Sequence, residues 1–272
     1  MPELPEVETT RRGIAPEVEG HRIAGVRVRQ PRLRWPVPVA RLRRELVGQV
    51  VSAVERRAKY LLLRTAAGTA LLHLGMSGSL RVVAAATPPG PHDHLDLLLD
   101  DGRCLRLRDP RRFGALLWTR RDPRRHPLLR DLGPEPFDPA FDGAYLHARA
   151  HGRRTAVKPF LMDGRVVVGV GNIYASEALF RAGIDPRRAA GRVASGRYAR
   201  LATAVREVLG EAIAAGGTTL RDYTGGHGEA GWFRLRLAVY GRAGASCPAC
   251  GGGVRSLRLG QRSTFYCMNC QH

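Results

Sequence analysis

Residues 247–270 read CPACGGGVRSLRLGQRSTFYCMNC, and their paired cysteines determine how the C-terminal part of the chain folds. It holds two CxxC pairs, Cys247 with Cys250 and Cys267 with Cys270, separated by 16 residues. Two such pairs at the ends of a short hairpin predict a site in which four thiolates surround one zinc ion. A pair of disulfides and an iron–sulfur cluster are the alternatives. Because four thiolates leave the ion no open position, we expect one structural Zn²⁺ with no catalytic role.

Positive charge marks both this hairpin and the whole chain. Arg255, Arg258 and Arg262 lie between the cysteine pairs, where they can face a phosphate backbone. The 272 residues include 44 Lys and Arg against 24 Asp and Glu, which gives a formal net charge of +20. This balance favours nucleic acid as the partner, although ribosomal proteins, membrane-surface proteins and arginine-biased proteomes share it. Lys59 and Lys158 are the only lysines in a chain rich in arginine, so each is a candidate for a specific role.

The first half of the chain has the pattern of a β-rich domain. A short helix is expected over 4–15, with Pro5 in its first turn, where a missing N–H costs little. Asp100-Asp101-Gly102-Arg103 is typical of a hairpin turn. Many short strands joined by such turns predict a sandwich or barrel. Apolar or alternating runs predict the strands at 21–29, 49–56, 59–65, 69–74, 79–84, 95–99, 104–108 and 115–119.

The second half changes character near residue 135. Pro134-Glu135-Pro136 and Asp138-Pro139 mark a linker. Apolar residues at helical spacing then predict helices, and Gly216-Gly217 end the last of them. The predicted helices lie at 142–150, 155–162, 172–182 and 197–215, and a small β-hairpin module is expected to follow over 236–272.

The sequence favours an intracellular location. It contains no apolar run of about 18 residues or more, the length that a membrane span needs. Its start, MPELPEVETT, has neither the basic segment nor the apolar core of a secretory signal. We therefore expect a cytoplasmic protein associated with the nucleoid. Cys104 stands apart from the other cysteines, and we interpret it as a buried strand thiol.

Pro2, Glu3 and Glu6 suggest a second kind of chemistry. Proline at position 2 allows removal of the initiator methionine, which would leave a secondary amine with a reference pKa near 8, against about 10.4 for lysine. Such an amine can attack a sugar C1′ and form an iminium ion, an electron sink that promotes strand cleavage by elimination. Glu3 could shuttle protons to the sugar. The plainer interpretation is that these residues only begin a helix, where the dipole favours acids.

A series of motifs, in order along essentially the whole chain, resembles the bacterial formamidopyrimidine-DNA glycosylases. They are PELPEVETTRRGI (2–14), RLRWPV (32–37), RRAKYLLL (56–63), HLGMSGSLR (73–81), HDHLDL (92–97), DPRRFGA (109–115), LGPEP (132–136), VVGVGNIYASEALF (167–180) and the terminal CxxC pairs.

The resemblance implies a two-domain α+β fold with DNA crossing between the domains. The N-terminal domain is expected to be a β-sandwich that carries a catalytic helix. The C-terminal domain is expected to carry a helix–two-turn–helix motif and a zinc-finger β-hairpin. The expected boundaries are 1–134 for the catalytic domain, 135–150 for the linker and first helix, 151–235 for the helix–two-turn–helix domain and 236–272 for the zinc hairpin.

The resemblance also implies the catalytic residues. Pro2 is expected to be the Schiff-base nucleophile, and Glu3 the proton donor and general acid/base. Lys59 is expected to serve the elimination chemistry and to contact phosphate. From the residues alone, Lys59 could equally be plain surface charge. Arg262 is expected to assist the second (δ) elimination and to grip the phosphates that flank the lesion.

Two further positions are expected to lie at the DNA backbone. His73, which alone could be a core histidine, is expected close to it. Asn172, which alone looks like a helix N-cap, is expected to bind phosphate within the helix–two-turn–helix. The remaining positions that match DNA contacts of the family are His92, Arg111 and Arg153.

Three side chains resemble the family's void-filling triad: Met76, Arg111 and Phe113. Apolar and planar groups of this kind can replace part of the stacking that is lost when a nucleotide leaves the duplex. Without the resemblance, Phe113 could be a loop anchor and Met76 a gap filler. The segment 218–231, TTLRDYTGGHGEAG, resembles the one that closes over the extruded base. The expected contacts to the damaged base are Glu6, Thr218 and Tyr223.

The function implied is base-excision repair by a monomer that acts on double-stranded DNA. It would remove oxidised purines, such as 8-oxoguanine and formamidopyrimidines, and cleave the abasic strand by β- and δ-elimination. An endonuclease VIII-like glycosylase for oxidised pyrimidines is the alternative, but the start PELPE and the stretch DPRRFG with Met76 favour the purine branch. A catalytically silent lesion-binding protein and a ribosomal or chromatin protein are alternatives of other classes.

Overall fold

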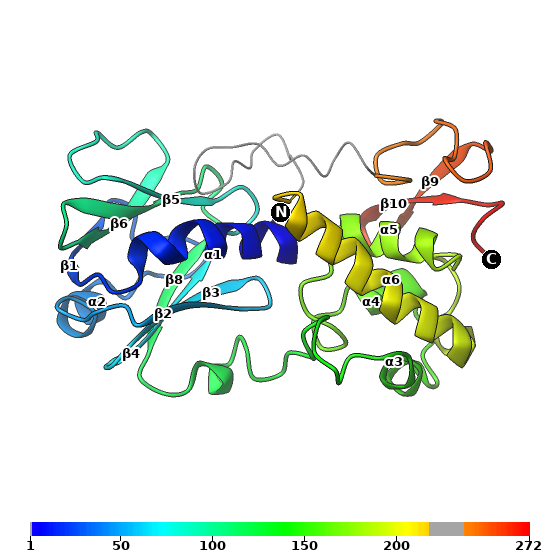
Figure 1. Ribbon diagram of the computed structural model, residues 1–272, viewed down its shortest axis with the longest axis horizontal. Helices are drawn as coiled ribbons and strands as arrows, with labels where there is room; N and C mark the ends of the chain where they lie inside the picture. The colour runs from blue at the N-terminus through cyan, green and yellow to red at the C-terminus, as the bar shows by residue number, and fades with distance from the viewer. Residues whose placement is uncertain (1, 218–236) are drawn as a thin grey trace. The chain divides into compact units, whose positions relative to one another are not determined.

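The computed structural model describes residues 2–217 and 237–272, which form two compact units (Figure 1). The first unit contains residues 2–131 and 215–217, and the second contains residues 132–214 and 237–272. The predicted α+β class is confirmed, since the first unit is built mainly on sheets and the second on helices and a hairpin. No helix in these described ranges is long and apolar enough to cross a membrane.

The strands of the first unit form two antiparallel, four-stranded sheets, with the orders β1-β6-β7-β5 and β2-β3-β4-β8. Each strand overlaps one of the stretches predicted from the sequence. The strands are β1 (Ile23–Val28), β2 (Ala53–Arg57), β3 (Tyr60–Thr65), β4 (Gly68–His73), β5 (Ser79–Ala84), β6 (Asp93–Leu99), β7 (Arg103–Arg108) and β8 (Ala115–Thr119).

The core of the first unit contains side chains from both sheets. Leu61 and Leu63 of β3 and Leu95 and Leu97 of β6 are completely buried in one hydrophobic cluster. Residues two apart on a strand point to the same face, so these pairs line the inner side of their sheets. Burial of one such side chain stabilises the fold by about 1.5–3 kcal/mol. The cluster, which also includes residues of β1, β2, β4, β7 and β8, therefore holds the two sheets together as a sandwich.

Helix α1 (Leu4–Val18) packs on β2, β3 and β5. It runs three residues beyond the predicted 4–15. Pro16 does not end it, because the proline φ suits a helix and only one backbone hydrogen bond is lost. Val18 lies beyond the proline and is fully buried, and this burial stabilises the last turn of the helix.

Helix α2 (Val39–Glu45) is not predicted by the sequence, because seven residues with three arginines show no clear helical period. A hydrogen bond at its last residue, Glu45, attaches this helix to β8. Glu45 accepts a hydrogen bond from Trp118 Nε1 of β8 at 2.7 Å. A short 3₁₀ helix, η1 (Pro123–Arg125), follows β8.

Helices dominate the second unit. Helix α6 packs against α3 and α5, and a Cβ at Gly143 of α3 would lie 2.4 Å from the Ala199 Cα of α6, so glycine permits this close approach. All four predicted helices and the predicted hairpin are confirmed within a few residues. The elements are α3 (Gly143–Ala150), α4 (Val157–Leu161), α5 (Asn172–Arg181), the 3₁₀ helix η2 (Ala190–Arg192), α6 (Ser195–Ala214), β9 (Val254–Leu259) and β10 (Arg262–Cys267).

Candidate functional site

The N-terminal residues predicted to be catalytic lie at the start of α1. Pro2 is buried and Glu3 is only 4% exposed. Glu3 and Glu6 form a reciprocal capping box: the Glu3 side chain accepts the N–H of Glu6, and Glu6 Oε2 accepts the N–H of Glu3 at 2.7 Å. The positive end of the helix dipole favours carboxylates at this position. The helix start therefore holds Glu3 in a fixed place beside Pro2.

Glu6 has a second contact besides the capping box. Its side chain is fully buried, and a Cβ at Gly217 would lie 3.3 Å from Glu6 Oε1. Gly217 has a φ of +84°, which favours glycine, and it directly precedes the segment 218–236. Thr218 and Tyr223, two predicted contacts to the damaged base, lie in that segment, outside the described residues. The predicted base contact of Glu6 stays a prediction.

Lys59 lies in the tight turn between β2 and β3, after Ala58, which has a φ of 55°. Arg56 pins this turn to α1. Its Nη1 donates to the Ala58 carbonyl at 2.9 Å, and its Nε donates to Glu8 Oε2 at 3.1 Å. Burial raises the pKa of Glu8, but hydrogen bonds from arginines of α1 and the charge of Arg56 outweigh it and hold the pKa below its usual 4.5. An ionised Glu8 thus couples the lysine turn to the helix that begins at Pro2 and Glu3.

His73 ends β4, opposite the start of β3. Its ring centroid lies 4.8 Å from that of Tyr60, and its Nδ1 accepts the N–H of Gly75 at 2.9 Å. Burial, followed by the positive charges of Arg34 and Lys59, lowers the pKa of His73 to about 4. The imidazole is therefore neutral near pH 7, and with Nδ1 accepting it carries its proton on Nε2. Nε2 can donate a hydrogen bond, which is what a contact to a phosphate oxygen requires.

The three residues predicted to fill the void lie on two loops of the first unit. Met76 lies between β4 and β5, while Arg111 and Phe113 lie between β7 and β8. Phe113 is 43% exposed, and the Arg111 guanidinium lies over its ring at 5.3 Å from the centroid. His92 comes directly before β6, and its carbonyl accepts the N–H of Asp109 at 2.9 Å. The antiparallel pairing places these loops at one end of the sheets, where β4 and β7 end and β5, β6 and β8 begin.

In the second unit, Asn172 is the first residue of α5 and Gly171 is its N-cap. The interpretation of Asn172 as the N-cap is therefore wrong by one position. The Asn172 side chain does not cap the helix but forms hydrogen bonds with other segments of the second unit. Its Oδ1 accepts from Lys158 Nζ at 2.7 Å and its Nδ2 donates to the Tyr240 hydroxyl at 3.3 Å.

Lys158 is a residue whose part the sequence analysis did not identify, although the scarcity of lysine drew attention to it. It is only 1% exposed, and its ammonium also donates to the Ser263 carbonyl at 3.0 Å and to Thr264 Oγ1 at 2.9 Å. Lys158 of α4 therefore joins the start of α5 to β10 of the zinc hairpin.

Arg262, predicted to be catalytic, is the exposed first residue of β10. It follows a tight turn in which Gly260 and Gln261 both have positive φ angles. Arg153, predicted to contact DNA, is exposed in the loop after α3, where its carbonyl accepts the N–H of Gly191 at 2.9 Å. The Arg262 guanidinium thus belongs to the start of a strand and that of Arg153 to a loop, and in both places backbone hydrogen bonds within the second unit fix the main chain.

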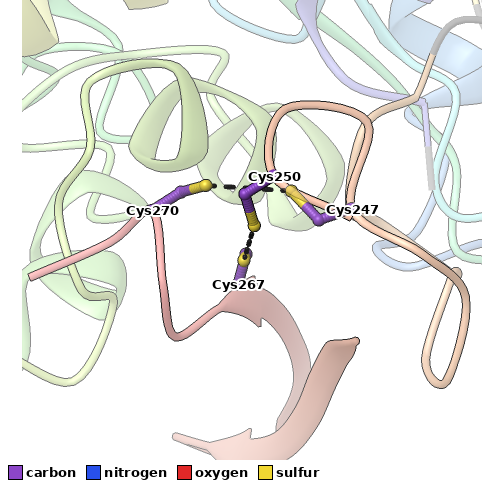
Figure 2. Close-up of side chains that lie close together, drawn as sticks. All are labelled: Cys247, Cys250, Cys267 and Cys270. Carbon is purple, nitrogen blue, oxygen red and sulfur yellow. Dashed lines mark hydrogen bonds between the residues drawn. The ribbon is translucent and has the colours of Figure 1, made fainter. Parts of the chain in front are cut away.

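The four clustered cysteines of the hairpin converge on one point, as Figure 2 shows. Their sulfur atoms all lie within 4.8 Å of one another, with 3.8 Å between Cys247 and Cys270 and 3.5 Å between Cys250 and Cys267. Sulfurs bound tetrahedrally at about 2.3 Å from a zinc ion would be about 3.8 Å apart. The donor set and its spacing therefore fit one structural Zn²⁺, as the sequence predicts.

The hairpin needs this ion because its own core is small. Within the described residues, its buried cluster consists of Val239, Cys247, Val254 and Cys267, with a few partly buried neighbours. So few apolar side chains cannot hold a hairpin alone, and metal binding supplies the missing folding free energy.

Comparison with known proteins finds one family along the chain. Residues 1–116 match the formamidopyrimidine-DNA glycosylase N-terminal domain, and residues 132–224 match the H2TH domain of the same glycosylase. Residues 246–272 match a zinc finger found in FPG and IleRS. Formamidopyrimidine-DNA glycosylases of Alkalilimnicola ehrlichii and Syntrophotalea carbinolica are 65% and 62% identical to this chain, with 100% of this chain and of each relative covered.

Solved structures of similar proteins agree with this result. The MutM (Fpg) protein of Thermus thermophilus has a TM-score of 0.88 and 42% identity, over 99% of this chain and 98% of its own. The Fpg of Lactococcus lactis in complex with DNA that contains an abasic site has a TM-score of 0.92 and 31% identity, over 99% of both chains. The same protein with DNA that contains Fapy-dG gives a TM-score of 0.91 at 30% identity, over 99% of this chain and 100% of its own.

Proposed function

The chain belongs to the formamidopyrimidine-DNA glycosylase family, and on this premise we propose that it releases oxidised purines from duplex DNA and then cleaves the strand at the abasic site. The observation that carries the proposal is the buried start of α1, where the capping box holds Glu3 beside Pro2. Complexes of the Lactococcus lactis relative with Fapy-dG DNA and with abasic-site DNA support the substrate class.

Removal of Met1 would expose the Pro2 secondary amine as the nucleophile. Its nitrogen bonds to C1′ of the extruded nucleotide while the glycosidic bond breaks and its electron pair leaves with the base. The Pro2 nitrogen, now a protonated ammonium, gives its proton to the Glu3 carboxylate, and the departed base takes a proton from water. Glu3 passes its proton to the sugar ring oxygen as the C1′–O4′ bond opens, and the nitrogen lone pair forms an iminium ion between Pro2 and C1′. The hydrogen-bond geometry at the helix start suits this task because it fixes the carboxyl group next to the amine.

Strand cleavage follows from the acidity that the iminium gives to C2′. Loss of a C2′ proton to solvent expels the 3′ phosphate (β-elimination). Loss of the C4′ proton then expels the 5′ phosphate (δ-elimination), so that a one-nucleotide gap remains. Lys59 and Arg262 are cations suited to stabilise the departing phosphates, and Arg56 supports this role for Lys59 by pinning its turn. Water then hydrolyses the remaining imine and regenerates Pro2.

Binding of DNA rests on residues of both units. We assign His73, Met76, His92, Arg111 and Phe113 of the first unit, and Arg153 and Asn172 of the second, to contacts with duplex DNA. The net charge of +20 suits this polyanionic partner. The bound zinc supplies no chemistry and keeps the hairpin with Arg262 folded.

Domain boundaries and location complete the proposal. Residues 1–134 form the catalytic domain, 135–150 the linker and first helix, 151–235 the helix–two-turn–helix domain and 236–272 the zinc hairpin. The protein acts as a monomer on nucleoid DNA. An endonuclease VIII-like preference for oxidised pyrimidines is not favoured, since the matched family and the named relatives are formamidopyrimidine-DNA glycosylases.

Borohydride trapping on a duplex with one 8-oxoguanine opposite cytosine tests the proposal. The zinc-loaded wild type, with loss of Met1 verified by mass, should give a covalent adduct that depends on the lesion. Pro2→Gly should give none, and an undamaged duplex serves as the control. Adducts only with oxidised pyrimidines would support the alternative, and no adduct with any damaged duplex would rule out the proposed chemistry.

A further inference from the structure

Two loops of the first unit are pressed together, backbone against backbone. We call residues 74–78 the methionine loop and residues 109–114 the arginine loop. A Cβ at Gly75 would lie 2.5 Å from the Gly114 nitrogen and 2.5 Å from the Phe113 carbonyl carbon, distances that no side chain tolerates. Glycine at position 75 therefore lets the two loops touch without a side chain between them.

The methionine loop is fixed from both ends. The N–H of Gly75 donates to His73 Nδ1 at 2.9 Å, and the N–H of Gly78 donates to the Leu74 carbonyl at 2.9 Å. A Cβ at Gly78 would lie 2.2 Å from that carbonyl oxygen, so the turn is as tight as the backbone allows. Met76, at the middle of this turn, has little freedom to move apart from its own side chain.

Asp109 closes the arginine loop. Its side chain is completely buried, and its Oδ2 accepts the N–H of Gly114, at the far end of the loop, at 2.6 Å. Its own N–H donates to the His92 carbonyl, and its carbonyl lies 2.9 Å from His94 Nε2. The Gly114 carbonyl accepts the N–H of Arg34 at 3.0 Å. Both ends of the loop are thus anchored, while its tip is exposed.

Stability alone does not account for a carboxylate at this position. Asp109 Oδ1 is buried and has no hydrogen-bond partner within residues 2–217 and 237–272, and a buried acceptor without a partner costs free energy. The Ser77 hydroxyl of the methionine loop shares this condition. We therefore look for the benefit of Asp109 in the side-chain bond that it does make among the described residues, the bond from the Gly114 N–H, which sets the shape of the arginine loop.

We propose that Asp109 is a positioning residue that locks the methionine and arginine loops into one rigid block. Met76 on one loop and Arg111 and Phe113 on the other then enter the duplex together, because Gly75 and Gly114 leave no room for one loop to move past the other. This inference rests on the proposed function, since it takes these three side chains to fill the space left by the extruded nucleotide.

Asp109→Ala in the full-length, zinc-loaded protein tests the inference. Misplacement of the two loops should lower kcat/KM for 8-oxoguanine excision from a duplex by about 10- to 100-fold. Trapping on a single-stranded oligonucleotide with an abasic site should change by less than about twofold, because no stacked duplex has to be filled there. Asp109→Asn should restore most of the duplex activity, since its amide oxygen can still accept from Gly114.

Asp131→Ala, which removes an exposed aspartate, is the matched control and should resemble the wild type on both substrates. If Asp109→Ala does not fold, Asp109→Ser carries the same expectation, because its shorter hydroxyl does not reach Gly114. An equal loss on both substrates, or full duplex activity in a folded variant, would overturn the inference. Failure of the wild type on every damaged duplex would instead count against the proposed function.

Discussion

Arg56 of β2 links Glu8 of α1 to the turn that carries Lys59. The Arg56 Nε lies 3.1 Å from Glu8 Oε2, and its Nη1 lies 2.9 Å from the Ala58 carbonyl oxygen. One guanidinium group therefore fixes the proposed elimination lysine relative to the helix that begins at the proposed nucleophile. Arginine suits this task because its planar, forked group donates in two directions at once.

Replacement of Arg56 by alanine should slow strand cleavage without removing any group that reacts. With the turn released, we expect kcat for cleavage of abasic-site DNA to fall by about tenfold, with KM changed less. Arg12→Ala is the matched control, because Arg12 also binds Glu8, at 2.9 Å, but does not reach the turn. Steady-state kinetics of the two variants would decide, and equal kcat values would contradict the prediction.

Loss of the Lys158 ammonium should lower both the stability of the second unit and the affinity of the protein for DNA. Lys158→Met leaves Asn172 Oδ1, the Ser263 carbonyl and Thr264 Oγ1 without this donor. The bond to Thr264 is buried, and a buried acceptor left unsatisfied costs about 1–3 kcal/mol. We expect a lower Tm and roughly tenfold weaker binding of abasic-site duplex.

Arg200→Ala removes one positive charge from the exposed face of α6 and controls for net charge in the Lys158 experiment. Fluorescence anisotropy at fixed salt concentration measures the affinity of both variants, since salt alone changes binding to DNA. Equal losses of affinity in both would show that the effect is one of net charge and not of the buried link.

His73 should make folding stability depend on pH in a defined window. Its pKa lies near 4 in the folded protein, against 6.5 for the unperturbed side chain, so the unfolded chain binds the proton first as the pH falls. The free energy of unfolding should therefore decrease from about pH 6.5 to about pH 4, by at most about 1.4 kcal/mol per pH unit, with no further contribution below that.

Urea denaturation of the wild type and of His73→Asn across that range measures the histidine contribution. The asparagine oxygen can still accept the N–H of Gly75, but asparagine does not titrate. The decrease in the free energy of unfolding that His73 causes between about pH 6.5 and about pH 4 should therefore be absent in the variant. If the free energy of unfolding changes with pH in the same way in both proteins, His73 is not the source of the pH dependence.

Removal of the metal should unfold the hairpin selectively. We expect a Cys250→Ser variant to lose zinc and to bind damaged duplex poorly, because the small cluster around Val239 and Val254 cannot hold the hairpin alone. Cys104→Ser, at a buried position of β7 that is remote from the four-cysteine site in sequence, should keep one zinc per chain. Metal analysis by mass spectrometry gives the stoichiometry, and a zinc-loaded Cys250→Ser protein would contradict the four-thiolate site.

Local signals explain what the sequence predicts well. Alternation of leucines predicts the strands of both sheets, and the spacing of Cys247, Cys250, Cys267 and Cys270 predicts the metal site, because period and spacing are properties of short stretches. The predicted end of α1 at residue 15, before Pro16, is wrong. The helix continues to Val18 because the stabilisation from burying the Val18 side chain outweighs the backbone hydrogen bond that the proline cannot make.

Links across long stretches of chain explain what the sequence does not predict. Arg56 binds Glu8 across 48 positions, and Lys158 reaches Ser263 and Thr264 across more than 100. No periodicity encodes such pairs, because they depend on how the elements pack. The bond from Gly114 to Asp109 spans only five positions, yet it also depends on a loop conformation that composition does not specify.

The burial of Lys158 has a practical consequence for chemical labelling. Lys59 and Lys158 are the only lysines of the chain, and at 1% exposure Lys158 offers almost no surface to a reagent in solution. Among the lysines, an amine-directed dye or crosslinker applied to the folded protein is thus confined to the one in the turn between β2 and β3. That turn carries a natural single-lysine handle for attaching a probe, with no second lysine to be mutated away first.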